Sequence, residues 1–497
     1  MPLHTWQSVA GRPGTVSRAV YGCERQLCVS ANQIKCFATP LVALTLQTQL
    51  APTTFHQNLK TAWKSLRFQA PGIATKIIAD GGENYEFEYV SPKGTQEADE
   101  WMATTLLEKP KTSSSQELVS ALVNDTKERN KCSIPAQDYV SRLYFSPGSK
   151  EGQYHICIFS QHAALDGRGS LLALNILLKK LVEPETPNKW GKEVEQLPLS
   201  MSYTLGLRKD GDKAPEGFQD LMEAMYKGQA ENQACSALFQ PSTMAYMPTF
   251  QPFATLPTHA SKKLIPDVAT QYAKFQTSAD AIKKAAKAHH VPFSYTVAAA
   301  IALALYKNSN NQSNAKAITL PGVPTDTRFR LPDNKRRTFI ANGIVAAGSM
   351  MKIDSETTET AKMPPPYWEV VDKIAKQWEA GKASELAIAL EDELSNVMSG
   401  MIQNAPESIF GPYNFYAPVG VCDELIEHSY GSGDALVTVE SPFITSYAAM
   451  TPCLAIHTWS WDGQFTALTN YSDEFYTTQF VEKYMSDIRS YLERLGA

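Results

Sequence analysis

One histidine in this sequence stands where a general base could act. His162 lies in the segment 160–167, four residues before the pair Asp166-Gly167. An apolar run over residues 154–159 precedes the segment and a leucine-rich run over 170–178 follows it, so we expect a strand, a sharp turn and a helix. A neutral imidazole accepts a proton from an attacking hydroxyl near pH 7. The spacing therefore predicts a base held on a loop, with an ordinary Asp-Gly turn as the alternative.

Another Asp-Gly pair of the chain illustrates that alternative. The pair at 462–463 lies between two alternating runs, 453–459 and 464–469, and is typical of a hairpin turn although His457 lies five residues upstream. Short motifs of this kind occur often by chance. Spacing alone therefore leaves both readings of His162 open.

The His-x-x-x-Asp-Gly spacing resembles the signature of the acyltransferases related to chloramphenicol acetyltransferase. That group includes plant-type BAHD acyltransferases, peptide-synthetase condensation domains and fungal alcohol acetyltransferases. The signature maps onto His162, Asp166 and Gly167. Condensation domains usually carry two adjacent histidines, whereas Gln161 holds the first place here, which fits free-standing O-acyltransferases. The resemblance implies an α/β (α+β) fold of two similar lobes, mixed sheets flanked by helices, and an active site in a tunnel between the lobes.

The resemblance also implies roles for the residues of the motif. His162 would be the general base, and Gly167 would permit the tight turn behind it. Asp166 would point away from the site and pair with an arginine, for which Arg328 in the run 324–328 is the candidate. Asn342-Gly343 follows at a plausible distance. A triad-like alternative, in which Asp166 orients His162 directly, stays open.

A pattern near the amino terminus resembles one branch of this group, the fungal acetyltransferases. Trp6 and the run 18–24, with Arg18, Gly22 and Glu24, resemble the Arg-x-x-Gly-x-x-Glu pattern of fungal acetyltransferases, with one extra residue before the glycine. The pattern, the lone histidine and the length look most like the fungal trichothecene 15-O-acetyltransferases. The Asp-Phe-Gly-Trp-Gly motif of the plant branch is absent, and residues 414–420 stand about where it would be.

These likenesses imply acetyl transfer from acetyl-CoA, used as co-substrate with no bound cofactor, to a small-molecule alcohol. The expected acceptor is the C-15 hydroxyl of a trichothecene sesquiterpenoid. Two alternatives stay open: a peptide-synthetase-type condensation enzyme, and a catalytically silent relative with a binding or regulatory role. The sequence does not identify the residues that bind the substrates.

Composition limits the other possibilities. The 497 residues carry a net charge of −5 without a basic cluster, which argues against a nucleic-acid partner. Eight cysteines are scattered through the chain without a Cys-x-x-Cys pair, so we expect neither a metal site nor a disulfide framework. Unpaired thiols suit a reducing compartment, and we expect the protein in the cytoplasm. No apolar run reaches membrane-spanning length, and the amino terminus lacks a signal pattern. We expect a monomer.

Composition and apolar patterns along the chain predict its lobes and several of its helices. We expect an N-terminal lobe over 1–190, a crossover rich in prolines over 191–260, and a C-terminal lobe over 261–497. In the second lobe, the run 294–305 is apolar nearly all round, which predicts a buried core helix. Residues 366–401 are predicted to be long and helical, and residues 474–495 to form an amphipathic helix.

Overall fold

The chain divides into two compact units, and neither is continuous in sequence. Unit 1 comprises Met1–Asp212, Asp326–Ile344 and Val421–Tyr447, and unit 2 comprises Lys213–Thr325, Val345–Gly420 and Ala448–Ala497. The computed structural model describes residues 4–33, 38–79, 84–125, 127–128, 138–187, 189–209, 211, 216–220, 223, 270–309, 317–320, 324–345, 351–354, 366–383, 385–404, 414–447, 454–473 and 475–495.

This division differs from the continuous lobes that the sequence predicts. Two stretches from the second half of the chain belong to unit 1, one because it pairs with a central strand and the other because it holds Arg328 beside Asp166. Neither stretch carries a composition signal that would assign it to the first half. Most of the predicted crossover at 191–260 lies outside the described residues.

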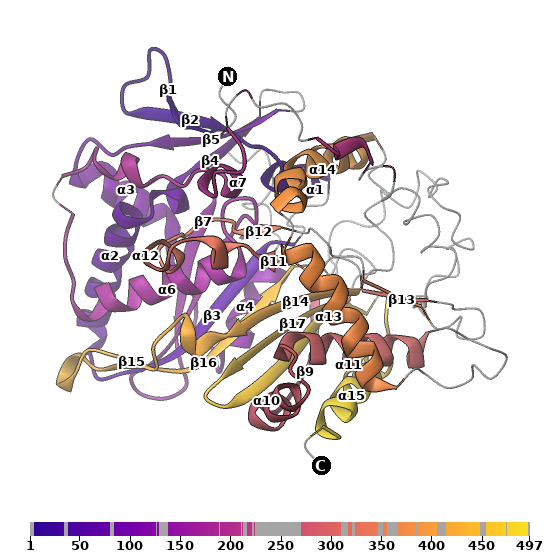
Figure 1. The fold of residues 1–497 in the computed structure, drawn as a ribbon. Coiled ribbons are helices and arrows are strands. Elements are labelled where there is room, and N and C mark those ends of the chain that lie inside the picture. The colour runs from indigo at the N-terminus through magenta and orange to yellow at the C-terminus, as the bar shows by residue number, and fades with distance from the viewer. Residues whose placement is uncertain are drawn as a thin grey trace. The chain divides into compact units, whose positions relative to one another are not determined.

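A six-stranded mixed sheet forms the centre of unit 1 (Figure 1). Its strands run in the order β15-β16-β3-β8-β7-β6, antiparallel except for the parallel pair β6 and β7. All residues of β8 are buried, because β8 lies between two strands and carries apolar side chains on both faces. The strands are β3 (Pro40–Thr48), β6 (Leu106–Glu108), β7 (Ser141–Pro147), β8 (Gln153–Ser160), β15 (Ser429–Tyr430) and β16 (Val437–Ser446).

The histidine loop connects this sheet to helix α6. The helix spans Gly167–Val182, packs on α2 (Pro52–Gln69), and also contacts β3 and β16. Asp166 caps its first turn by accepting a hydrogen bond from the N–H of Gly169 at 2.7 Å. The strand, turn and helix predicted around His162 are confirmed.

The remaining elements of unit 1 surround this arrangement. A second sheet has the order β1-β2-β5-β4, formed by β1 (Gln7–Ser8), β2 (Thr15–Ala19), β5 (Tyr85–Val90) and β4 (Lys76–Ala79). The other helices are α1 (Cys23–Gln33), α3 (Thr95–Thr105), α4 (Ser115–Asn124), α7 (Met201–Thr204) and α12 (Asp333–Arg336), with 3-10 turns η1 (Pro71–Ala74), η2 (Glu193–Gln196), η3 (Arg328–Arg330), η5 (Cys422–Glu424) and η6 (Gly433–Ala435). The short strands β11 (Thr325–Asp326) and β12 (Ile344–Val345) pair with each other.

Unit 2 is built around a four-stranded sheet and a buried helix. The sheet has the order β14-β17-β18-β9, and β10 and β13 pair separately. Helix α11 (Phe293–Asn308) is buried from Tyr295 to Leu305, as its apolar sequence predicts. The region predicted to be long and helical at 366–401 contains two helices, α13 (Tyr367–Ala383) and α14 (Glu385–Asn404). The other elements are β9 (Thr270–Ser278), α10 (Ala279–Ala288), β10 (Ala317–Leu320), β13 (Met351–Asp354), β14 (Asn414–Val421), β17 (Leu454–Trp461), β18 (Gln464–Ser472) and α15 (Thr478–Glu493).

The Asp-Gly pair at 462–463 is a hairpin turn, as predicted. It joins the antiparallel strands β17 and β18, and Asp462 and Gly463 have φ of +48° and +71°. Positive φ at both positions is the signature of a type I′ turn. Asp166 instead has φ of −92° and begins a helix, so two similar dipeptides take different structures.

Within the described part of the chain, no single helix is both long enough and apolar enough to cross a membrane. Helices α10 and α11 taken together have the length and apolar composition of a membrane span, but the chain bends by 101° between them.

Candidate active site

The backbone of the histidine loop is fixed at both ends. The loop leaves β8 at Ser160, and the N–H of Gln161 donates to the carbonyl of Val140 at 2.8 Å. The N–H groups of Ala164 and Leu165 then donate to the Gln161 carbonyl at 3.0 and 3.1 Å. His162 is therefore the second residue of a tight turn, held between a central strand and the start of α6.

The side chain of His162 is half-buried, and its Nδ1 atom is buried without a hydrogen-bond partner among the described residues. Burial lowers the pKa of His162 below its ordinary value, against opposing effects of its own backbone carbonyl and of Asp166. The imidazole is therefore neutral at pH 7, the state that a proton acceptor requires.

The Asp166 carboxylate is buried and receives four hydrogen bonds. Its Oδ1 accepts from Gly169 N–H at 2.7 Å and from Arg328 Nη2 at 3.0 Å. Its Oδ2 accepts from Arg328 Nη1 at 3.0 Å and from Gly343 N–H at 2.7 Å. Burial alone would raise the pKa of Asp166, but the Arg328 charge and these hydrogen bonds outweigh it and lower the pKa.

Arg328 uses all five of its N–H donors. Besides the bidentate pair with Asp166, Nε donates to the Phe339 carbonyl at 3.1 Å, Nη2 to the Ala341 carbonyl at 2.5 Å and Nη1 to Asp326 at 2.9 Å. The Arg328 and Asp166 side chains are each only 2% exposed. The pair implied by the resemblance is thus present, buried and fully hydrogen-bonded.

This geometry disfavours the triad-like alternative. No hydrogen bond joins Asp166 to His162 in the part of the chain that the structure describes, and both Asp166 oxygens are occupied by other donors. Asp166 supports the loop through the α6 cap and through Arg328.

The glycine required by close packing is not Gly167. A Cβ at Gly167 would meet nothing within 4 Å, and its φ is not positive. A Cβ at Gly343 would lie 2.6 Å from Arg328 Cζ, and one at Gly169 would lie 2.8 Å from the Ala341 carbonyl oxygen. The turn role expected of Gly167 is therefore corrected: Gly169 and Gly343 are the positions where the ion pair leaves no room for a side chain.

These contacts predict opposite outcomes for two alanine substitutions. Gly343→Ala should displace the Arg328 guanidinium and destabilise the protein by about 1–3 kcal/mol, the usual cost of overpacking. Gly167→Ala should leave the thermal midpoint unchanged or raise it slightly, since alanine favours helix over glycine. Thermal unfolding of both variants measures the difference, and equal midpoints would contradict the packing seen around Arg328.

A second ion pair, which the sequence analysis does not identify, lies beside the first. Nε of Arg168 is 3.0 Å from Oδ2 of Asp326. The two side chains are 28% and 21% exposed, so this pair is more solvated than the one between Asp166 and Arg328. The available signal was the recurrence of Asp-x-Arg at 166–168 and 326–328.

The amino-terminal pattern forms a cluster of its own. Arg18 makes a bidentate pair with Glu24 at 2.8 and 2.9 Å, and its guanidinium lies over the rings of Trp6 and Phe87, at 5.6 and 5.1 Å. Arg18 is 2% exposed, and Gly22 has φ of +59°. These contacts give the pattern a packing role.

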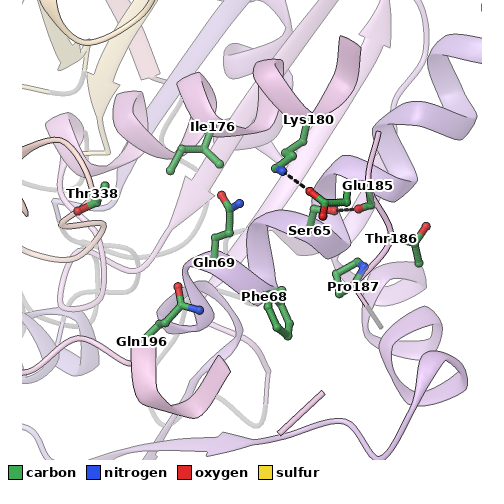
Figure 2. A pocket seen from close by; sticks show the side chains of 10 residues that line it. All are labelled: Ser65, Phe68, Gln69, Ile176, Lys180, Glu185, Thr186, Pro187, Gln196 and Thr338. Carbon is green, nitrogen blue, oxygen red and sulfur yellow. Dashed lines mark hydrogen bonds and ion pairs between the residues drawn. The ribbon is translucent and has the colours of Figure 1, made fainter. Parts of the chain in front are cut away.

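A cavity of about 560 Å³ lies elsewhere in unit 1 (Figure 2). It involves the second half of α6 rather than the first turn, and none of the motif residues lines it. Two of its lining residues, Lys180 and Glu185, form an ion pair 2.7 Å apart. The cavity is therefore separate from the histidine loop. Its lining residues are Ser65, Phe68, Gln69, Ile176, Lys180, Glu185, Thr186, Pro187, Gln196 and Thr338.

Among the described residues, no group of three or more His, Cys, Asp or Glu side chains is placed to hold a metal ion.

Comparison with known proteins identifies the fold. No protein-family model matches the sequence, and no curated protein matches it. Among solved structures, the TRI3 trichothecene 15-O-acetyltransferase from Fusarium sporotrichioides is similar over 100% of this chain and 98% of its own, with a TM-score of 0.80 and 19% identity. The chain thus has the two-lobe fold of chloramphenicol acetyltransferase-like and condensation-domain acyltransferases, as the sequence predicts.

Structures of proteins with other activities share the fold at lower similarity. A mutant starter condensation domain of rhizomide synthetase RzmA, in complex with C8-CoA and Leu-SNAC, covers 97% of this chain and 94% of its own, with a TM-score of 0.58 and 12% identity. The epimerization domain from the third module of tyrocidine synthetase B covers 98% of this chain and 99% of its own, with a TM-score of 0.56 and 11% identity. Since this fold also occurs in an epimerization domain, the fold does not fix the reaction.

Proposed function

We propose that the protein is an acyl-CoA-dependent O-acyltransferase that transfers an acetyl group from acetyl-CoA to a hydroxyl of a secondary metabolite. The observation that carries this proposal is His162. It is neutral and half-buried, and it stands on a turn fixed by β8, by the α6 cap and by the Asp166–Arg328 pair. A positioned neutral imidazole is suited to general-base catalysis.

The proposed reaction is direct transfer. Because Nδ1 of His162 is buried, Nε2 is the nitrogen left to accept the hydroxyl proton as the alcohol oxygen forms a bond to the thioester carbonyl carbon. The tetrahedral intermediate then collapses, the C–S bond breaks, and the thiolate of coenzyme A takes the proton back from the imidazolium. Every atom and proton is accounted for without an acyl-enzyme, so the kinetics should be sequential.

The pKa of His162 leads to a prediction about pH. Because burial lowers that pKa, the neutral base should persist to lower pH than for an exposed histidine. The acid limb of kcat/KM against pH should therefore have its midpoint below the ordinary histidine value of about 6.5. A midpoint above 7 would contradict the neutral-base assignment.

The finer proposal is that the acceptor is the C-15 hydroxyl of a trichothecene. Two observations support it: the similarity to TRI3 over the full chain, and the amino-terminal pattern, whose Arg18 and Glu24 are buried against each other. The test is to incubate the protein with acetyl-CoA and a 15-hydroxy trichothecene and to map the ester by NMR. We expect the ester at C-15. Acetylation solely at C-3, or of simple straight-chain alcohols only, would reject this substrate while leaving the wider proposal in place.

A condensation enzyme is the second candidate, and the observation in its favour is the similarity to the RzmA domain. Gln161, in place of a first histidine, argues against it. We also propose that the protein works in the cytoplasm as a monomer. Among the described residues, Cys23, Cys28, Cys157 and Cys422 form no disulfide, which suits a reducing compartment.

A further inference from the structure

Two tripeptides of the same form face each other behind the histidine loop. Residues 166–168 and 326–328 both read Asp-x-Arg, and each aspartate pairs with the arginine of the other. Asp166 binds Arg328 through two contacts of 3.0 Å, and Asp326 lies 3.0 Å from Arg168. We call these four side chains the Asp-x-Arg clasp.

One side of the clasp is firmly anchored. The N–H and the hydroxyl of Thr327, between Asp326 and Arg328, both donate to the Gly343 carbonyl, at 2.9 and 2.8 Å. Asp326 itself accepts from the N–H and from Nη1 of Arg328. Contacts other than the one with Arg168 therefore hold the Asp326 carboxylate in place.

The other side of the clasp is the start of α6. Arg168 is the second residue of that helix, and His162 lies six residues before it. The Asp166–Arg328 pair ties the helix start to residues 326–328 at Asp166, the residue before the helix. The Arg168–Asp326 pair adds a second tie two residues further along the chain.

The two pairs differ in burial, which separates their roles. The Asp166–Arg328 pair is 2% exposed on each side and is needed for stability. The Arg168–Asp326 pair is partly exposed, and ion pairs of that kind add little to stability. An ion pair that adds little stability and lies next to the loop of His162 is suited to holding that loop in one orientation.

We propose that Arg168 and Asp326 are positioning residues, which fix the orientation of the first turn of α6 and so the position of His162 relative to the reacting atoms. This inference rests on the proposed acyl transfer. It goes beyond that proposal by assigning a role to the outer half of the clasp.

The first test is kinetic. Arg168→Gln should lower kcat about 10- to 100-fold, since a misplacement near 1 Å can cost about a hundredfold in rate. KM for acetyl-CoA and the thermal midpoint should stay close to wild type. Arg168→Lys, which keeps the charge, should recover most of the lost rate. The matched control is Lys180→Gln, which removes an ion pair of 2.7 Å further along the same helix and should leave kcat unchanged.

Asp326→Asn completes a double-mutant cycle. If the two residues act as one pair, Arg168→Gln with Asp326→Asn should cost no more in kcat than the more damaging single variant. Multiplying effects would overturn the proposal, as would wild-type kcat in Arg168→Gln. A loss of rate matched by an equal loss of thermal stability would also overturn it.

Amide hydrogen exchange gives a readout that does not depend on the substrate. In Arg168→Gln the amides of Ala164 and Leu165 should exchange faster than in wild type, and in Lys180→Gln they should not. Unchanged amide exchange in Arg168→Gln would overturn the positioning role of Arg168 and Asp326, even if the enzyme is active. A wild-type protein inactive toward all acceptors would overturn the proposed function, and the exchange result would then judge the clasp alone.

Discussion

His162→Ala should lower kcat about 10²- to 10⁴-fold, the usual contribution of a general base. The thermal midpoint should stay close to wild type, because His162 is half-buried on a turn whose hydrogen bonds are made by backbone atoms, and its Nδ1 has no hydrogen bond to lose among the described residues. Initial rates of coenzyme A release, with thermal unfolding of the same preparation, measure both.

The matched control for this prediction is a histidine on the surface of the same unit. His428 is exposed, and its Nε2 lies 2.8 Å from Asp423. His428→Ala removes the same ring from a place without a role in the proposal, so turnover should be retained. Near wild-type turnover in His162→Ala would show that His162 is not the base.

Arg328→Gln should cost about 3–5 kcal/mol in the free energy of unfolding, because it leaves the buried Asp166 carboxylate without its counter-charge. Glutamine also removes donors that now bind the carbonyls of Phe339 and Ala341. Turnover should fall together with stability. Arg330→Gln, two residues further on and half-buried beside Phe329, is the control and should cost much less.

The same pair makes stability depend on pH in a defined direction. The folded-state pKa of Asp166 lies below its unfolded value, so the pair stabilises the protein above that unfolded value and the stabilisation is lost as the pH falls through the folded one. Asp166→Asn should remove part of this acid sensitivity. If Asp166→Asn instead stays as stable as wild type and loses turnover alone, the triad-like alternative regains support.

Local patterns in the sequence were sufficient for the elements near the site. The buried run before His162 became the central strand β8, and the leucine-rich run after it became α6. The Asp166–Arg328 pair was predicted from the resemblance, because the two residues are 162 positions apart in the sequence and no periodic signal links them.

What the sequence missed depends on contacts distant along the chain. The need for glycine at 343 arises only once Arg328 is folded against it, and no turn signal reveals it. Unit 1 takes β16 from the second half of the chain because β16 pairs with β3, and the sequence of neither strand specifies its partner. The Arg168–Asp326 ion pair was not predicted either. The two Asp-x-Arg tripeptides are present in the sequence, but nothing local indicates that they pair.

The most direct test of the central claim is a transfer assay with radiolabelled acetyl-CoA and a panel of hydroxylated and amine acceptors. The account predicts labelled ester, formed by wild-type protein and reduced at least about a hundredfold in His162→Ala. Labelled amide as the only product, or no product with any acceptor, would contradict it.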